Sequence, residues 1–221
     1  MMRGLWWSLS SSRASSLLSR LMELRESEVR WLVEARMREF RENGRKPSRE
    51  LFKELCFCIL TANFSAERCM RIQQEIGDGF LTLSEGELAR ELRRLGHRYP
   101  ESRARYIVEA RWIADKLREV IESFGSQLEL RDWLAKSIKG LGYKEASHFL
   151  RNIGFTDLAI LDFHILNLLA SYGIVEKPRS LTRRRYLEIE GKLREIARSL
   201  GLTLAELDLY LWYLETGRVL K

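Results

Sequence analysis

Hydrophobic residues recur every three to four positions along almost the whole chain, a spacing typical of one buried face of an α-helix. The pattern predicts helices over about 21–43, 50–62, 66–76, 85–95, 100–124, 130–138, 143–152, 163–172 and 182–199, with a last helix from 203. No run alternates between apolar and polar residues for long enough to predict a strand. Only three prolines and 14 glycines interrupt the chain. The sequence therefore predicts an all-α fold.

Two predicted helices begin with a reciprocal capping pattern, in which a hydroxyl residue is followed three positions later by a glutamate. Ser84 with Glu87 fits this pattern, and so does Thr203 with Glu206. The two pairs define where the short helix near 85 and the last helix of the chain begin.

The charge balance of the chain is basic. The 221 residues include 38 Lys and Arg against 31 Asp and Glu, a formal net charge of +7, and 29 of the basic residues are arginines. Arginine suits phosphate because its planar guanidinium donates two hydrogen bonds at once. With 45% hydrophobic and 31% charged residues and no long apolar run, the composition predicts a soluble globular protein and excludes a membrane span. The charge indicates an anionic partner without identifying it.

The cysteines and histidines do not form a metal-binding pattern. Cys56, Cys58 and Cys69 contain no C-x-x-C pair and are too few for a disulfide framework, which favours reduced, buried thiols in a cytoplasmic protein. The three histidines are scattered and do not suggest zinc. We therefore expect no catalytic metal.

The most informative segment is KGLGYKEASH, residues 139–148, which lies between two predicted helices. Gly140 and Gly142 flank a leucine and allow the backbone to turn tightly and to approach another molecule closely. Backbone amides at the start of the next helix then offer a seat for a phosphate. On the local sequence alone, an ordinary helix–turn–helix corner explains the same glycines.

Two charged residues near this turn give it a possible chemistry. Lys144 falls in the first turn of a predicted helix, where a cation opposes the helix dipole and needs another reason to be present. Eighteen residues later, Asp162 follows an apolar run and precedes the next helix. An aspartate in that place is also explained as a simple N-cap.

Together these motifs resemble the helix-hairpin-helix DNA glycosylase superfamily, and within it most closely the archaeal-type (type 2) 8-oxoguanine DNA glycosylase/AP lyases. The resemblance covers about residues 50–221 and rests on LCFCILTANFSAERC, on KGLGYKEASHFLRNIGFTDLAILDFHIL and on the ending with Trp212 nine residues before Lys221. The chain departs from the pattern in an N-terminal extension of some 20 residues. It departs also in the loop after the hairpin, where Gly154 is the only glycine or proline.

The resemblance implies a fold of two helical lobes with the active-site cleft between them. We expect residues 19–64 together with 165–221 to form a terminal lobe and residues 65–164 to form a central lobe that carries the hairpin. Residues 1–18, apolar at first and then rich in serine, are predicted to form a flexible arm. The implied partner is double-stranded DNA containing oxidised guanine. A monomer is expected, because no heptad repeat demands an oligomer.

The resemblance also implies a mechanism. Lys144 is expected to attack C1′ of an extruded nucleotide and to form a Schiff base, from which β-elimination nicks the strand. An amine nucleophile must be neutral, and a helix N-terminus and a desolvated pocket both favour that form. Asp162 is expected to orient the reacting groups and to stabilise positive charge on the sugar.

Three residues are candidates for recognising the extruded base. The resemblance implies that Lys221, including its terminal carboxylate, separates 8-oxoguanine from guanine, because the lesion carries an N7–H donor where guanine carries an acceptor. It implies likewise that Trp212 helps to build the base pocket. The alternatives are a frayed terminus for Lys221 and a core position for Trp212. Tyr99 is a candidate stacking aromatic or a core residue.

Other residues are candidates for contacting DNA. Asn63 ends the TAN stretch, where members of the superfamily place a polar residue in the gap left by the flipped base; a helix terminator is the alternative. His164 is close enough to Asp162 to reach phosphate, or it is a half-buried structural histidine. Hairpin carbonyls around Gly140 and Gly142 are candidates to hold a monovalent cation, as in the wider superfamily.

Two other functions stay open on the sequence. One is the same chemistry on another oxidised base, such as a damaged pyrimidine. The other is a non-catalytic helix-hairpin-helix DNA-binding module, in which Lys144 only contacts phosphate.

Overall fold

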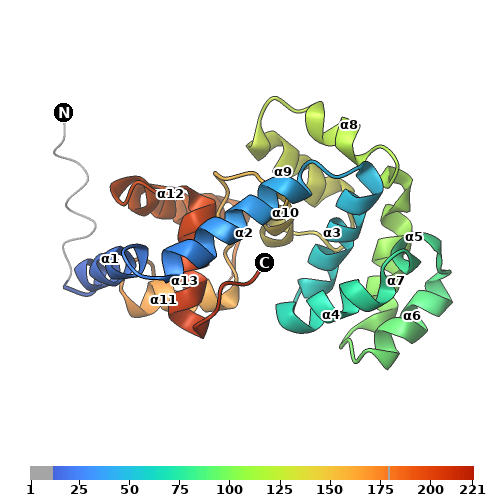
Figure 1. The fold of residues 1–221 in the computed structure, drawn as a ribbon, viewed down its shortest axis with the longest axis horizontal. Coiled ribbons are helices and arrows are strands. Elements are labelled where there is room, and N and C mark those ends of the chain that lie inside the picture. The colour runs from blue at the N-terminus through green and yellow to red at the C-terminus, as the bar shows by residue number, and fades with distance from the viewer. Residues whose placement is uncertain (1–11, 179) are drawn as a thin grey trace. The chain divides into compact units, whose positions relative to one another are not determined.

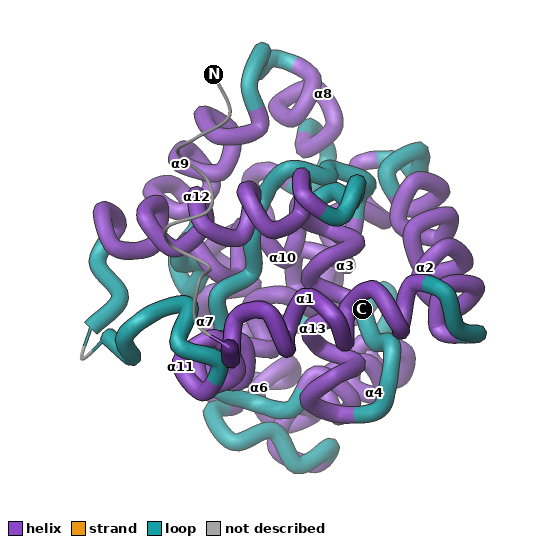
Figure 2. Tube along the Cα trace, turned by 90° about the vertical axis from the view of Figure 1, so that its left-hand side faces the viewer, coloured by secondary structure: helices purple, strands orange, loops and turns teal. Residues whose placement is uncertain are grey.

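The computed structural model describes residues 12–178 and 180–221, and every regular element among them is helical (Figure 2). Thirteen α-helices and one short 3-10 helix account for these elements (Figure 1). The all-α prediction is confirmed. Within the same residues, no helix combines the length and the apolar character that a membrane crossing requires.

The contacts within the chain divide it into two compact units, which we call the terminal unit and the hairpin unit. The terminal unit contains the described residues 12–38 and 156–220, and the hairpin unit contains residues 39–155 and Lys221. The first boundary falls inside one helix, between Arg38 and Glu39.

The terminal unit is built around its last helix. Its helices are α1 (Ser12–Arg25), α2 (Val29–Asn43, whose last five residues belong to the hairpin unit), α11 (Phe163–Ser171), α12 (Arg183–Ser199) and α13 (Leu204–Thr216). Helix α13 packs against α1, α11 and α12. Most of its residues from Leu204 to Leu211 are buried, so this helix supplies the centre of the core.

The hairpin unit is built around α3. Its helices are α3 (Ser48–Thr61), α4 (Ala66–Ile76), α5 (Gly79–Thr82), α6 (Glu85–Arg94), α7 (Pro100–Ala110), the 3-10 helix η1 (Arg111–Ile113), α8 (Leu117–Glu122), α9 (Gln127–Ser137) and α10 (Tyr143–Asn152). Helix α3 contacts α4, α5, α7, α8 and α10, and it lies beside α4 and α7 in Figure 1. Residues 55–60 have no exposed surface, which explains their uninterrupted apolar sequence.

Both predicted capping pairs are present. The Ser84 hydroxyl accepts the Glu87 amide at 3.3 Å, and the Glu87 carboxylate accepts the Ser84 amide at 2.9 Å. Thr203 and Glu206 make the same exchange at 3.2 and 2.8 Å. The helix starts read from these patterns are confirmed, because the reciprocal bonds satisfy amides that a helix otherwise leaves without partners.

Two predicted helices are interrupted in the structure. The expected helix over 21–43 is two helices with a turn at residues 26–28, where Ser27 Oγ donates to the Leu24 carbonyl and accepts the Val29 amide. The expected helix over 100–124 is broken at η1. There the Arg111 guanidinium donates to the carbonyls of Phe80 and Leu83, at either end of α5. Prediction from periodicity was wrong at these two points because a local side-chain bond and a long-range one, respectively, compete with the helical pattern.

The boundaries of the two compact units differ from those expected for the two lobes. Residues 39–64 group with the hairpin unit rather than with the terminal helices, because α3 packs on α4, α7 and α10. Of the expected N-terminal arm, residues 1–11 lie outside the described part. Residues 12–18 belong to α1, where Ala14 and Leu17 are buried.

Candidate active site

The hairpin before α10 has the backbone geometry that its glycines suggest. Gly140 adopts φ +88°, in the left-handed region, and a Cβ placed there would lie 2.6 Å from the Tyr106 ring. Gly142 is the N-cap of α10, and the Glu145 carboxylate accepts its amide at 3.2 Å. Gly140 is therefore required both for its conformation and for its close approach to an aromatic ring.

Helix α9 holds the start of α10 through a fully buried cation. Arg131 has no exposed surface; its guanidinium donates to Ser147 Oγ at 3.3 Å and lies 4.9 Å from the Tyr143 ring centre. The Tyr143 hydroxyl in turn donates to the Asp132 carboxylate. Because Tyr143 and Ser147 belong to the first two turns of α10, these contacts fix the helix on which the candidate nucleophile stands.

Lys144 is the second residue of α10, as predicted. Its side chain is 20% exposed, and its Nζ lies 3.6 Å from the Glu145 carboxylate. Burial raises the pKa of the Cys69 thiol to about 12, and the positive charge of Lys144 is the largest influence opposing that rise. The ammonium group therefore lies near the α4 thiol as well as beside Glu145.

Lys221 is anchored in the hairpin unit. Its Nζ donates to Glu54 Oε2 at 2.8 Å and to Gln73 Oε1 at 2.6 Å, and it lies 4.3 Å from the centre of the Phe57 ring. The side chain is 16% exposed. The frayed-terminus alternative is wrong for this side chain, because three partners on α3 and α4 hold it.

The positive charges of Lys144 and Lys221 lower the pKa values of the same two buried groups, the His148 imidazole and the Cys58 thiol. Burial lowers the pKa of the His148 imidazole well below its usual value, and the nearby charges of three cations lower it further, namely Arg151, Lys144 and Lys221. Burial and Glu54 raise the pKa of the Cys58 thiol, and the same three cations oppose the rise. Both lysines therefore lie near one buried cluster of α3 and α10.

The turn that carries Asn63 is conformationally unusual. Asn63 has φ +58°, the only positive φ outside glycine in the described residues. The Arg103 guanidinium donates to the neighbouring Ala62 carbonyl at 2.6 Å, and the His97 ring bridges the Leu60 carbonyl and the Tyr99 amide, each at 3.0 Å. The bonds of His97 and Arg103 hold the turn in its strained conformation.

Tyr99 is half-buried rather than a core residue. It precedes α7, and the guanidinium groups of Arg98 and Arg103 lie 5.2 and 5.5 Å from its ring centre. His97 and Arg103, which hold this region together, were not recognised in the sequence. The carbonyls to which they bond, those of Leu60 and Ala62, lie more than 35 positions earlier in the chain.

In the terminal unit, Asp162 is the N-cap of α11. Its Oδ1 accepts the Ile165 amide at 2.9 Å, so the capping interpretation of this residue is confirmed as one of its roles. The irregular segment before it is held by two side chains of α12. The Tyr186 hydroxyl donates to the Ala159 carbonyl at 2.6 Å, and the Glu190 carboxylate accepts the amide of the same residue at 2.9 Å.

Beyond Asp162 lies a short row of rings. The His164 ring meets the Trp212 ring edge-on at 5.3 Å between centres, and Phe163, which is 64% exposed, meets His164 at 5.9 Å. His164 Nδ1 also lies 3.8 Å from the Glu215 carboxylate. The buried Trp212 Nε1 has no hydrogen-bond partner among the described residues, so this indole retains an unused donor.

The part of the chain that the structure describes contains no group of three or more His, Cys, Asp or Glu arranged to hold a metal ion. Cys56, Cys58 and Cys69 are buried and free, as predicted. Three polar residues of the network that holds Lys221 were not predicted from the sequence: Glu54 and Asn152, which are buried, and Gln73, which is half-buried. The one available signal was Glu54, a single acid inside the apolar run of α3.

Comparison with known proteins gives consistent matches over most of the chain. The sequence pattern of a family described as 8-oxoguanine DNA glycosylase matches residues 33–202. A protein of Korarchaeum cryptofilum named 8-oxoguanine DNA glycosylase/AP lyase is 59% identical over 93% of this chain and 98% of its own length. The crystal structure of the Methanocaldococcus jannaschii 8-oxoguanine glycosylase/lyase with a 15mer DNA containing 8-oxoguanine is 51% identical. It has a TM-score of 0.91 and covers 93% of this chain and 100% of that one. The Thermotoga maritima 8-oxoguanine DNA glycosylase structure is 47% identical, with a TM-score of 0.89 over 94% and 99% of the two chains.

Proposed function

Because this chain belongs to the 8-oxoguanine DNA glycosylase family, we propose that it excises 8-oxoguanine from double-stranded DNA and nicks the strand at the resulting abasic site. The observation that carries the proposal is Lys144 in the first turn of α10, directly after a glycine hairpin. A cation is unfavourable at a helix N-terminus, and an amine nucleophile for a sugar is a specific reason to keep one there.

In the proposed reaction, Lys144 performs both steps. Its neutral Nζ forms a bond to C1′ while the bond between C1′ and N9 of the base breaks, and the electron pair leaves with the base, which takes up a proton. Opening of the sugar ring converts the adduct into a Schiff base, which makes the C2′ proton acidic. Loss of that proton expels the 3′ phosphate and nicks the strand.

Asp162 is proposed to supply the negative charge that the reaction needs. A carboxylate that stabilises positive charge on the sugar lowers the barrier without bonding to the substrate. The N-cap bond uses Oδ1 and fixes the carboxylate plane, which supports this role because a preoriented group loses little freedom in the transition state.

The remaining candidates are proposed to bind DNA. Trp212 offers a ring and an unused N–H, and Lys221 offers a held cation, for recognising the base. Tyr99, Asn63 and His164 are proposed to contact the DNA near the extruded nucleotide. We propose that the enzyme acts as a monomer, because the sequence has no heptad repeat that would demand an oligomer.

The hairpin itself is proposed to bind the DNA backbone. The amides that follow Gly140 and Gly142 suit a phosphate, and carbonyls of the same turn suit a monovalent cation that bridges to one. No step of the proposed reaction depends on that cation.

Borohydride trapping tests the proposal. Wild-type protein, Lys144→Gln and the control Lys136→Gln, an exposed lysine of α9, are incubated with 8-oxoguanine duplex and borohydride. We expect a covalent complex with the wild type and the control and none with Lys144→Gln. A folded wild type that traps no duplex would contradict lyase chemistry and favour the non-catalytic module. Trapping only on a duplex with a different oxidised base would reassign the substrate.

A further inference from the structure

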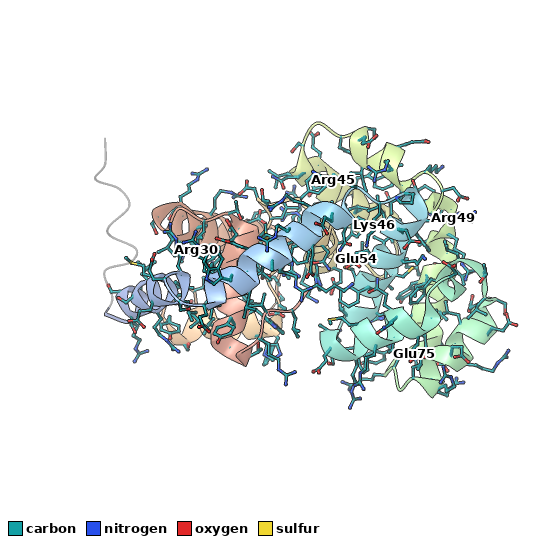
Figure 3. The ribbon with its side chains drawn as sticks, in the orientation of Figure 1. Arg30, Arg45, Lys46, Arg49, Glu54 and Glu75 are labelled. Carbon is teal, nitrogen blue, oxygen red and sulfur yellow. The ribbon has the colours of Figure 1, made fainter. Side chains whose placement is uncertain are left out.

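Glu54 is a buried carboxylate at the centre of a polar network in the hairpin unit. It stands on α3, where Figure 3 labels it, and it is 7% exposed. Its Oε1 accepts the Asn152 amide group at 2.7 Å, and its Oε2 accepts Lys221 Nζ at 2.8 Å and Gln73 Nε2 at 3.1 Å. A buried charge is costly unless it is paired and hydrogen-bonded, and both oxygens of Glu54 meet that requirement.

The partners of Glu54 are themselves fixed. Gln73 Nε2 donates to the Lys53 carbonyl as well as to Glu54, which leaves its Oε1 to accept from Lys221. Asn152 is fully buried, and its Oδ1 accepts from Arg151 at 2.9 Å, which leaves its amide nitrogen to donate to Glu54. Each group therefore has one consistent donor or acceptor role, so the network admits one arrangement.

This network does more than fill the core, because one of its members is also a candidate for reading the base. The Lys221 side chain is held by the Glu54 carboxylate, the Gln73 carbonyl oxygen and the Phe57 ring, while it shares the His148 and Cys58 environment with Lys144. Fixing a long, flexible side chain in advance removes the entropy that substrate binding would otherwise have to overcome.

We propose that Glu54 is a positioning residue that holds Lys221 in place for base excision, an inference that rests on the proposed function. Glu54 acts through Lys221 rather than on the substrate, and Gln73 assists it as the second acceptor. A consequence distinguishes this role from general stability. An abasic site has no base to recognise, so strand nicking at a preformed abasic site does not need Lys221 to be held.

The test compares two activities of the same protein. Single-turnover excision from 8-oxoguanine duplex and nicking of a preformed abasic duplex are measured for the wild type and for Glu54→Gln, which keeps the shape and removes the charge. We expect excision to fall at least about tenfold and nicking to change less than about twofold. Leu88→Ala, a core change on α6 outside the network, is the stability control and should leave the ratio of the two rates unchanged.

A double-mutant cycle tests whether Glu54 acts through Lys221. We expect Lys221→Met to lower the ratio as Glu54→Gln does, and the double variant to be no worse than the poorer single one. Should Glu54→Gln fail to fold, Gln73→Met removes one acceptor of Lys221 and should lower the ratio about threefold.

Three results would overturn the inference: parallel loss of both activities in the folded variants, an unchanged ratio, or effects of the two substitutions that multiply. A wild type that excises no 8-oxoguanine would instead overturn the proposed function, and this is measured first.

Discussion

Helices α10 and α11 each carry at their start a residue proposed to act in the reaction, yet the two helix starts are built differently. Helix α11 begins with Asp162, whose carboxylate accepts an amide of its own first turn at 2.9 Å. Helix α10 begins with a glycine that has no side chain to cap it, and a lysine occupies its first turn. The first start follows the rules of helix stability. The second departs from them at Lys144, although Glu145 in the same turn accepts the Gly142 amide.

The difference between Asp162 and Lys144 shows which kind of residue indicates a function from the sequence alone. A residue that already stabilises the fold needs no second explanation, so Asp162 is ambiguous by itself. A residue placed against the helix dipole needs one, so Lys144 is informative without any structure. Removal of either side chain should therefore lower turnover, but only removal of the Asp162 carboxyl group should also lower the stability of the fold.

The largest effect is expected at Lys144. Lys144→Gln removes the proposed nucleophile, and we expect turnover on 8-oxoguanine duplex to fall about a thousandfold or more. Unfolding free energy should stay the same or rise by up to about 1 kcal/mol, because a cation leaves a helix N-terminus. Single-turnover kinetics and urea unfolding measure the two quantities. A clear loss of stability would mean that Lys144 supports the fold, and the contrast with Asp162 would then fail.

Two substitutions of Asp162 separate its role as the N-cap of α11 from its proposed role in the reaction. Asp162→Asn keeps a capping oxygen, so we expect stability within about 0.5 kcal/mol of the wild type but turnover reduced by about a hundredfold. Asp162→Ala should lose the same turnover and also about 1 kcal/mol of stability. Thr182→Ala removes the cap of α12 and is the matched control, with a similar loss of stability and unchanged turnover. Near-normal turnover in Asp162→Asn would reduce this residue to a cap.

A smaller effect is expected where the α10 start depends on its hairpin. Gly140→Ala forces a Cβ into the Tyr106 ring at a positive φ, and we expect a loss of about 1–3 kcal/mol together with weaker DNA binding. Gly86→Ala, within α6 and facing little but the end of the Arg90 side chain, should stabilise by about 0.5–1 kcal/mol and leave DNA binding unchanged. Equal affinities of the two variants for duplex would separate the hairpin from DNA binding.

Much of the fold was predictable because its signals are local. Hydrophobic periodicity and the two capping pairs depend on residues within four positions of each other, and both are found as expected. The broken helix at η1 was not predictable, because Arg111 meets carbonyls about 30 positions earlier in the chain. A periodic pattern cannot show that such a distant hydrogen bond will interrupt a helix, because the bond depends on how the helices pack.

The residues of the candidate site likewise fall into those that local sequence reveals and those that only tertiary packing reveals. The hairpin glycines and Lys144 are visible in the sequence because each departs from what a helical chain needs locally. Glu54 and Asn152 lie 98 positions apart and show their relation only when α3 packs on α10. Lys221 could be proposed from a resemblance, but the partners that hold it could not.

Helix α10 carries a buried imidazole, His148, whereas the imidazole of His164 on α11 is exposed. Burial and three nearby cations lower the pKa of His148 well below its usual value, so the folded protein keeps it neutral. Below about pH 6.5 the unfolded chain takes up a proton that the folded one excludes, so unfolding free energy should decrease as the pH falls, by at most about 1.4 kcal/mol per pH unit for this group.

His148→Phe should flatten this dependence, leaving the part that comes from His97, whose pKa burial also lowers. His164→Gln is the matched control, because that ring is 50% exposed and its removal takes away no buried group. Urea unfolding at several pH values between 5 and 8 gives the slopes. Equal slopes for wild type and His148→Phe would show that the proton is taken up elsewhere. The start of α10 would then be unusual in its lysine alone, without the buried imidazole one turn further along the helix.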